Sequence, residues 1–224
     1  MTTPITLITG ATGGIGAALA QALAHHELIL LGRDAAKLEA LRDSLPNAHA
    51  VTLELRAPHS FTTALERFGH VDNLVHNAGV VQLSTVEETG LEVWRAMLEV
   101  NLIAVVELTR VLLPRLRVAR GQMLFVNSGA GLHANAGWSV YAASKFALRT
   151  FAESLALEEG LLRVQSVYPG RTATPMQEAV RAQEGAAYEP QAYIQPETLA
   201  QTIRAMLEMP RDSVMAQVVV NRPG

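Results

Sequence analysis

The segment Tyr141-Ala-Ala-Ser-Lys145 places a phenol and an ammonium four residues apart, and Lys145 is one of only two lysines among the 224 residues. On a helix, side chains at this spacing project from one face. Free tyrosine has a pKa of about 10, and a neighbouring ammonium stabilises the phenolate and lowers that pKa. The pair therefore predicts a group that exchanges a proton near neutral pH, although a surface pair on an amphipathic helix would show the same spacing.

Ser128 follows an apolar run, Met123–Asn127, that is typical of a buried strand. Doubly wound sheets bind ligands at the carboxyl ends of their strands, so a hydroxyl there is placed to hold a carbonyl oxygen near Tyr141. The alternative is an ordinary serine in the glycine-rich turn Ser128-Gly-Ala-Gly131.

A glycine cluster, Thr9-Gly10-Ala11-Thr12-Gly13-Gly14-Ile15-Gly16, follows the apolar run Ile5–Ile8. Between a strand and a helix, glycines let the backbone approach a pyrophosphate, and the helix N-terminus offers free N–H groups to the anion. A tight connection without a ligand is the alternative. The GK[ST] sequence of phosphate-binding NTPases is absent.

Arg33 and Asp34 follow the second predicted strand, where dinucleotide-binding proteins choose between NAD and NADP. An acidic side chain there accepts from the ribose 2′-OH of NAD, whereas an arginine accommodates the 2′-phosphate of NADP. Asp34 also fits the N-cap of a helix that begins at Ala35. We therefore expect NADP(H) as the cofactor, and NAD(H) if Asp34 faces the ribose instead. A third possibility is that Arg33 is an ordinary surface residue with no role in binding.

Short apolar runs alternate with helical patterns along the whole chain, which predicts an α/β fold. We expect a Rossmann-like, doubly wound, seven-stranded parallel sheet with helices on both faces, in one domain spanning 1–224. The expected strands are Ile5–Thr9, Leu28–Leu31, His49–Leu53, Asn73–His76, Met123–Asn127, Arg163–Tyr168 and Ala216–Val220; the expected helices lie near 15–25, 35–44, 60–68, 92–116, 139–159 and 197–209. The segment 171–196 contains three prolines and resembles a loop long enough to form a substrate lid.

The composition excludes several function classes. A net charge of −3 without a basic run predicts no nucleic-acid partner, and the absence of cysteine excludes disulfides and thiolate metal sites. No apolar stretch is long enough for a membrane span, and no signal peptide precedes the first strand, so we expect a cytoplasmic protein. The pair His25-His26 has no third ligand nearby in the sequence, and we expect no metal site.

The chain resembles the short-chain dehydrogenase/reductase family over essentially its full length. The resemblance rests on Thr9-Gly10-x3-Gly14-x-Gly16, Asn77-Ala78-Gly79, Asn101, Ser128, Tyr141-x3-Lys145 and Pro169-Gly170. Two positions depart from the family pattern: His76 replaces an asparagine, and Glu54 stands where an aspartate usually faces the adenine. We interpret His76 as a structural residue at the end of a strand.

The resemblance implies a catalytic tetrad of Ser128, Tyr141, Lys145 and Asn101. Tyr141 would be the general acid in reduction, Lys145 would lower its pKa and bind the nicotinamide ribose, Ser128 would orient the carbonyl, and Asn101 would hold a water behind Lys145. Besides Tyr141 and Lys145, the residues implied to bind the cofactor are Gly10, Thr12, Gly13, Gly14, Ile15, Gly16, Arg33, Glu54, Leu55, Asn77, Ala78, Gly79, Pro169, Gly170, Thr172 and Thr174.

These patterns predict an NADP(H)-dependent oxidoreductase that transfers hydride between its cofactor and a small carbonyl compound or secondary alcohol. The alternatives are an NAD-dependent alcohol dehydrogenase of the same family and a dinucleotide-sensing regulator without activity. Resemblance also implies a homodimer or homotetramer, with the predicted helices 92–116 and 139–159 at the interface. The predicted lid has only Arg171 and Arg181 as cations, which favours a neutral or mildly polar substrate.

Overall fold

Neighbouring residues of the first strand are buried on opposite faces of one sheet. In the computed structural model, which describes residues 3–223, Leu7 packs with helices α3 (Phe61–Leu65), α5 (Ala104–Ala119) and α6 (Ser139–Glu158). Ile8 packs with α1 (Gly14–Ala22), α2 (Ala35–Asp43) and α8 (Pro196–Leu207). The strands are β1 (Ile5–Thr9), β2 (Glu27–Gly32), β3 (Ala48–Thr52), β4 (Asn73–His76), β5 (Gln122–Val126), β6 (Arg163–Pro169) and β7 (Gln217–Val220). The helices are α1 (Gly14–Ala22), α2 (Ala35–Asp43), α3 (Phe61–Leu65), α4 (Leu91–Leu98), α5 (Ala104–Ala119), α6 (Ser139–Glu158), α7 (Pro175–Gln183) and α8 (Pro196–Leu207).

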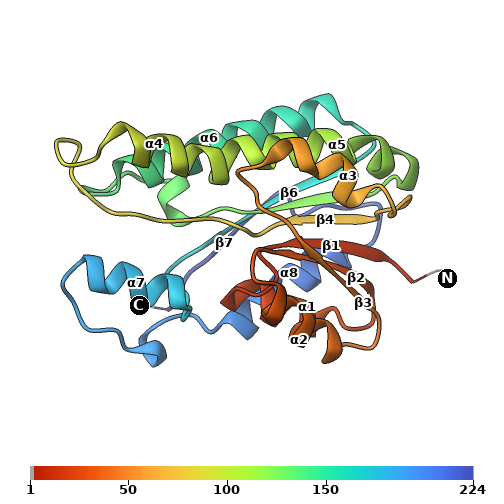
Figure 1. The fold of residues 1–224 in the computed structure, drawn as a ribbon, viewed down its shortest axis with the longest axis horizontal. Coiled ribbons are helices and arrows are strands. Elements are labelled where there is room, and N and C mark those ends of the chain that lie inside the picture. Colours follow the sequence, from red (N-terminus) through yellow and green to blue (C-terminus); the bar gives the residue numbers. More distant parts are fainter. Residues whose placement is uncertain (1–2, 224) are drawn as a thin grey trace.

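The seven strands are all parallel and lie in the order β3-β2-β1-β4-β5-β6-β7. Helices α3, α4, α5 and α6 cover one face, and α1, α2 and α8 cover the other (Figure 1). The strand order reverses between β1 and β4, and ligands of doubly wound sheets bind beside this reversal, outside the carboxyl ends of the strands. The predicted fold is confirmed, and each predicted strand is present with its ends shifted by no more than one residue.

The single helix predicted near 92–116 is wrong in one respect. A π-helical turn, Glu99–Ile103, separates α4 from α5 and contains Asn101. Such a turn inserts an extra residue into the helix and often lies at a functional site. Here it turns the Asn101 amide toward the loop after β4, where Oδ1 of Asn101 accepts from the N–H of Val80 at 2.9 Å.

The interpretation of 171–196 as a loop is also wrong, because α7 occupies much of its first half. Its role as a substrate lid stays a prediction. Thr174 caps this helix by accepting from the N–H of Gln177 at 3.2 Å, and Pro175 occupies the first helical position. Proline suits that position because its missing N–H would have no helical partner there. Pro175, one of the three prolines that suggested a loop, is therefore the first residue of a helix.

None of the helices within residues 3–223 is long and apolar enough to cross a membrane.

Candidate active site

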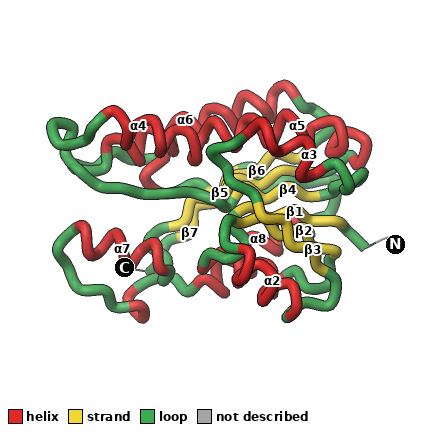
Figure 2. The backbone as a smooth tube through the Cα atoms, viewed as in Figure 1, coloured by secondary structure: helices red, strands yellow, loops and turns green. Residues whose placement is uncertain are grey.

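A cleft with a volume of about 950 Å³ opens at the carboxyl ends of the strands. The loops that follow β1, β4, β5 and β6 meet there between the two helical layers (Figure 2). Every site residue predicted from the sequence lines this cleft except Gly16 and Asn101, which lie behind its wall. The cleft is of the size of small-molecule and cofactor sites.

The glycine turn forms one end of the cleft. Gly10 has a φ of 62°, a left-handed conformation that glycine adopts without strain. Gly13 is the N-cap of α1, and no side chain of the described residues caps this helix. The N–H groups of its first turn therefore have no helical partner and can bind an anion. A Cβ on Gly14 would lie 2.7 Å from Cγ2 of Thr174, so a side chain there would fill the space beside the turn.

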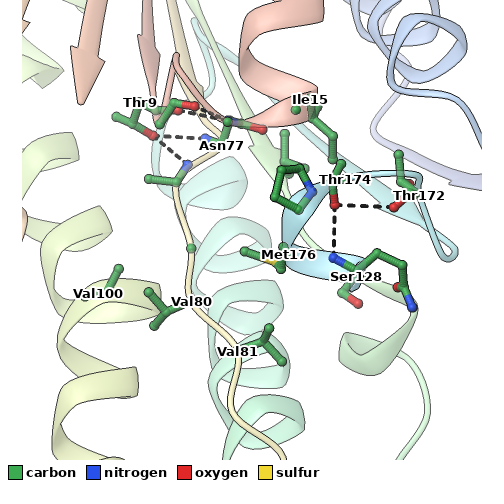
Figure 3. Close-up of a pocket in the computed structure, with 18 of the residues that line it drawn as sticks. Thr9, Ile15, Asn77, Val80, Val81, Val100, Ser128, Thr172, Thr174 and Met176 are labelled. Carbon is green, nitrogen blue, oxygen red and sulfur yellow. Dashed lines mark hydrogen bonds between the residues drawn. The ribbon is translucent and has the colours of Figure 1, made fainter. Parts of the chain in front are cut away.

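Thr9 and Asn77 hold the glycine turn against the end of β4 (Figure 3). The Thr9 hydroxyl accepts from the N–H groups of Asn77 and Ala78, each at 3.0 Å. The Asn77 amide donates to the carbonyl oxygens of Thr9 and Gly10 at 3.0 and 3.1 Å. Asn77 thus fixes the shape of the turn, and Thr9 is a positioning residue that the sequence analysis quoted only as part of a motif.

We expect Gly16→Ala to destabilise the protein by about 3 kcal/mol, because its Cβ would lie 2.2 Å from the Gly10 carbonyl oxygen and force the turn apart. Gly69→Ala is the matched control, since a Cβ on Gly69 meets nothing within 4 Å. Urea unfolding of the two variants measures the difference. Equal stability of both variants would contradict the close packing of the turn.

Tyr141, Lys145 and Ser128 meet at the other end of the cleft. Tyr141 and Lys145 lie on α6 and are both buried, and the Lys145 ammonium is 5.9 Å from the centre of the Tyr141 ring. Lys145 Nζ donates to the carbonyl oxygen of Val126 at 3.1 Å, which ties it to the end of β5. Ser128 is the second residue of the loop after β5, and its hydroxyl accepts from the N–H of Ala130 at 3.2 Å. The three predicted residues therefore come together from two elements.

Burial raises the pKa of the Tyr141 phenol, and the Ser128 hydroxyl acts in the opposite direction with a smaller effect. The sequence predicts a lowered pKa for Tyr141, but its net shift in this structure is upward, because removal from water disfavours the phenolate more than the Ser128 hydroxyl stabilises it. A contribution of Lys145 to this pKa stays a prediction. Tyr141 therefore keeps its proton at neutral pH, as a proton donor must.

Burial lowers the pKa of Lys145 to about 8. Between pH 8 and the ordinary lysine pKa of about 10.4, the unfolded chain holds a proton on this residue that the folded protein has lost. The contribution of Lys145 to the free energy of unfolding must therefore increase with pH between these two values.

We expect the free energy of unfolding of the natural protein, relative to Lys145→Met, to increase by about 1–2 kcal/mol between pH 8 and pH 9.5. Urea unfolding at both values tests this. Lys37→Met is the matched control, because it removes an exposed lysine instead of a buried one. A constant difference for Lys145→Met would contradict the lowered pKa.

Asn101 is 1% exposed and joins the loop after β4 to α6. Its amide donates to the carbonyl oxygen of Val80 at 2.9 Å and to the Ser144 hydroxyl at 3.0 Å, and Ser144 donates to the carbonyl oxygen of Tyr141 at 2.7 Å. Asn101 therefore positions the start of α6. Its role in holding a water stays a prediction.

Asn127 is a positioning residue that the sequence analysis did not single out. Its amide donates to the carbonyl oxygen of Lys145 at 3.2 Å, and its Oδ1 accepts from the N–H of Ser128 at 2.9 Å. It links Ser128 to the helix that carries Tyr141. Its place directly before Ser128 is the only sequence signal, and an asparagine at a strand end usually means a turn.

His76, at the end of β4, is a structural residue as interpreted. Its Nε2 lies 2.9 Å from the Thr109 hydroxyl, its ring stacks on Phe125 at 5.0 Å, and it does not line the cleft. Burial lowers the pKa of His76 to about 3, so the ring is neutral.

Arg33, Asp34 and Lys37 lie where the adenosine end of a dinucleotide would bind. Asp34 caps α2 by accepting from the N–H of Lys37 at 3.1 Å, and this bond is the main cause of its lowered pKa. Arg33 forms no hydrogen bond or ion pair with any residue in 3–223. The guanidinium is therefore free for a ligand, while the carboxylate is already engaged.

The cleft wall around Tyr141 is mostly apolar. Trp138, just before α6, packs edge-on against Tyr141 with ring centres 5.8 Å apart. Val80, Val81 and Met176 also face the cavity (Figure 3). Besides Lys145, Arg171 is the one cation at this end of the described cleft, and both of its terminal nitrogens donate to Glu184, at 2.8 and 2.6 Å.

The remaining predicted residues line the walls between these ends. Glu54 and Leu55 follow β3, and Glu54 accepts from the N–H of Arg56 at 3.0 Å. After β6, the Thr172 hydroxyl donates to the carbonyl oxygen of Gly170 at 3.1 Å, and that of Thr174 donates to Thr172 at 3.3 Å. The polar edge of this segment faces the glycine turn, where Thr174 meets Gly14.

A family model described as short chain dehydrogenase matches residues 4–185. L-fucose dehydrogenase from Mus musculus is 32% identical over 213 residues, covering 90% of this chain and 76% of that protein. The 3-alpha-(or 20-beta)-hydroxysteroid dehydrogenase of Mycobacterium tuberculosis is 32% identical over 182 residues, covering 77% and 70%.

Solved structures are similar over nearly the whole chain. An alcohol dehydrogenase from Thermococcus sibiricus, complexed with 5-hydroxy-NADP, has a TM-score of 0.90 at 27% identity and covers 100% of both chains. A short chain dehydrogenase from Escherichia coli CFT073, complexed with NADPH, has a TM-score of 0.88 at 28% identity and covers 98% of this chain and 97% of that one.

Proposed function

The chain belongs to the short-chain dehydrogenase/reductase family of oxidoreductases, and from this premise we propose that it is an NADP(H)-dependent carbonyl reductase in which Tyr141 is the proton donor. The observation that carries the proposal is one cleft with an uncapped helix N-terminus at one end and the buried Tyr141 and Lys145 pair at the other. A nicotinamide cofactor supplies the hydride when it is bound.

The residues of the cleft fit such a cofactor. The glycine turn, with Thr12 and Ile15, would hold the pyrophosphate, and Arg33 with Lys37 would bind the 2′-phosphate. Glu54, Leu55, Asn77, Ala78 and Gly79 would line the adenosine half. The nicotinamide half would be held by Lys145 and by the segment that contains Pro169, Gly170, Thr172 and Thr174.

In the proposed reduction, Ser128 donates a hydrogen bond to the carbonyl oxygen of the substrate and fixes its orientation. As hydride reaches the carbonyl carbon, negative charge develops on that oxygen, and Tyr141 transfers its phenolic proton to it. Lys145 is mostly charged at pH 7 because its pKa is about 8, and this charge stabilises the phenolate that forms. Tyr141 holds its proton before the step, because burial raises the pKa of its phenol.

The substrate is proposed to be a neutral carbonyl compound with an apolar group. Glu184 binds Arg171 through both nitrogens and Arg181 at 2.7 Å, so both cations of this segment are engaged within the protein. The aromatic and aliphatic wall beside Tyr141 then offers apolar contact rather than a free charge to a carboxylate or phosphate.

The proposal is tested by following the oxidation of NADPH and NADH with a panel of carbonyl compounds. The neutral members are ketones, aldehydes, diketones and keto sugars, and the charged members are keto acids. We expect turnover with NADPH and a preference for neutral members over keto acids. Tight cofactor binding with no turnover across the panel would favour the sensing regulator, whereas equal use of NADH would favour the NAD-dependent alternative.

We also propose a homodimer or homotetramer that uses α5 and α6. Val106 on α5, Phe146 on α6 and Ile103 in the π turn are large apolar residues that are 37%, 39% and 46% exposed. Light scattering of the purified protein tests this, and a monomer at micromolar concentration would contradict it.

A further inference from the structure

Two neighbouring histidines and a glutamate that is distant in the sequence meet at the amino-terminal edge of the sheet, whereas the cleft lies at the carboxyl edge. His25 and His26 follow α1 and precede β2, and Glu208 directly follows α8. These helices pack against each other below the sheet (Figure 1), which brings Glu208 to His25 across 183 residues. One ligand atom from each of the three side chains lies within 4.8 Å of the others. The third ligand missing from the sequence around His25-His26 is therefore supplied by the fold.

One oxygen, Oε1 of Glu208, lies between the two imidazoles. It is 2.7 Å from Nε2 of His25 and 3.9 Å from Nε2 of His26. Ligand atoms around a tetrahedral zinc ion are about 3.4 Å apart, because zinc bonds to nitrogen and oxygen are about 2.0–2.1 Å long. The two observed spacings bracket this value. Small movements of both His25 and Glu208, whose side chains are 50% and 35% exposed, would be needed to bring the three atoms to the spacing that zinc requires.

His26 is held in the orientation that a metal ligand needs. Its side chain is 5% exposed, and its Nδ1 lies 2.8 Å from the Thr6 hydroxyl, which in turn accepts from the Asn73 amide at 2.7 Å. Metal-binding histidines are oriented in this way through their second ring nitrogen. Nε2 then faces Glu208 and forms no hydrogen bond with any residue of the described chain. This nitrogen, 3.9 Å from Oε1 of Glu208, is therefore available to a metal ion.

Arg204 is the main competitor for the carboxylate. Its Nε lies 3.0 Å from each oxygen of Glu208. A guanidinium so close repels a divalent cation and weakens its binding. The same contact supplies a test, because removal of Arg204 should strengthen metal binding and leave the three ligands in place.

We propose that His25, His26 and Glu208 bind one divalent transition-metal ion, with zinc as the best match to two imidazole nitrogens and one carboxylate oxygen. Water completes the coordination. The ion links the ends of α1 and α8 and stabilises the folded chain. It lies at the amino-terminal edge of the sheet, because His26 precedes β2 and contacts Thr6 near the start of β1. Catalysis at the opposite edge does not require it.

The test uses tag-free protein that has been treated with a chelator and dialysed. Zinc is titrated in competition with a chromophoric chelator, and thermal unfolding is followed with zinc at about 100 times the measured dissociation constant. We expect one ion per chain and an increase in Tm of about 5–10 °C. His25→Gln and Glu208→Gln should each remove both effects, and Arg204→Gln should tighten binding by about tenfold.

His49→Gln is the matched control. His49 lies 3.0 Å from Glu27, a half-buried histidine–carboxylate pair that is not part of a cluster of three ligands within the described chain. This variant should bind zinc like the natural protein. The proposal is overturned if no stoichiometric zinc binding is found, or if binding persists in the His25→Gln/Glu208→Gln double variant. His25→Gln changes an exposed side chain and is expected to fold, so its result stands even if Glu208→Gln is unstable.

Discussion

Tyr141→Phe is expected to lower turnover with any carbonyl substrate about a thousandfold. The substitution removes one hydroxyl and leaves the ring, so the packing against Trp138 at 5.8 Å and the contact with the Lys145 ammonium at 5.9 Å remain. The bound carbonyl oxygen then has no proton donor at the position that Tyr141 occupies. Steady-state kinetics give the loss of turnover, and nucleotide fluorescence should show NADPH affinity within about threefold of the natural protein.

Tyr168→Phe is the matched control for this experiment. Tyr168 is also buried, at 1% exposure, but it lies in β6 and does not line the cleft. Its hydroxyl lies away from the cleft, so removing it should leave turnover unchanged. Undiminished turnover of Tyr141→Phe together with weakened NADPH binding would remove Tyr141 from the role of proton donor.

Arg33→Ala is expected to weaken NADPH binding about thirtyfold and NADH binding by less than about threefold. A charge-assisted hydrogen bond from a guanidinium to a phosphate contributes about 1.5–3 kcal/mol, and only NADPH carries the 2′-phosphate. Arg33 lines the cleft and is free of protein partners within residues 3–223, whereas the Asp34 carboxylate is occupied at the start of α2. Titration of each nucleotide into each variant measures the two ratios.

Arg56→Ala serves as the control for charge alone. Arg56 is an exposed arginine near the same edge of the sheet, but it lies outside the cleft and pairs with Glu54 at 3.7 Å. Its removal should leave the ratio of NADPH to NADH affinity unchanged. If Arg33→Ala weakened the binding of NADPH and NADH equally, Asp34 would be the residue that selects the cofactor, and the NAD-dependent alternative would be favoured.

The layered fold could be predicted from the sequence because the strands are buried on both faces. Leu7 and Ile8 are both apolar, and a run of apolar residues bounded by glycine has few interpretations besides a central parallel strand. The features that the sequence analysis missed depend on contacts between distant segments. The π turn at Glu99–Ile103 accompanies the bond between Asn101 and Val80, and neither residue reveals it alone.

Which residues form the site was easier to predict from the sequence than the pKa values of those residues. Spacing placed Ser128, Tyr141 and Lys145 together, because strand ends and helix faces follow simple periodicities. Burial depends on everything that surrounds a side chain, so the sequence predicted the wrong direction for the pKa of Tyr141. The same limit hid Glu208, which comes near His25-His26 only because α1 and α8 pack side by side.

Transfer of deuterium from labelled NADPH tests the central claim most directly. NADPH carrying deuterium at one or the other C4 position is supplied with the best carbonyl substrate of the panel, and the alcohol formed is analysed by mass spectrometry. The account predicts one deuterium on the carbinol carbon from one of the two labelled forms, with the yield lost in Tyr141→Phe. Tight binding of both labelled forms with no deuterium in any product would contradict hydride transfer in this cleft.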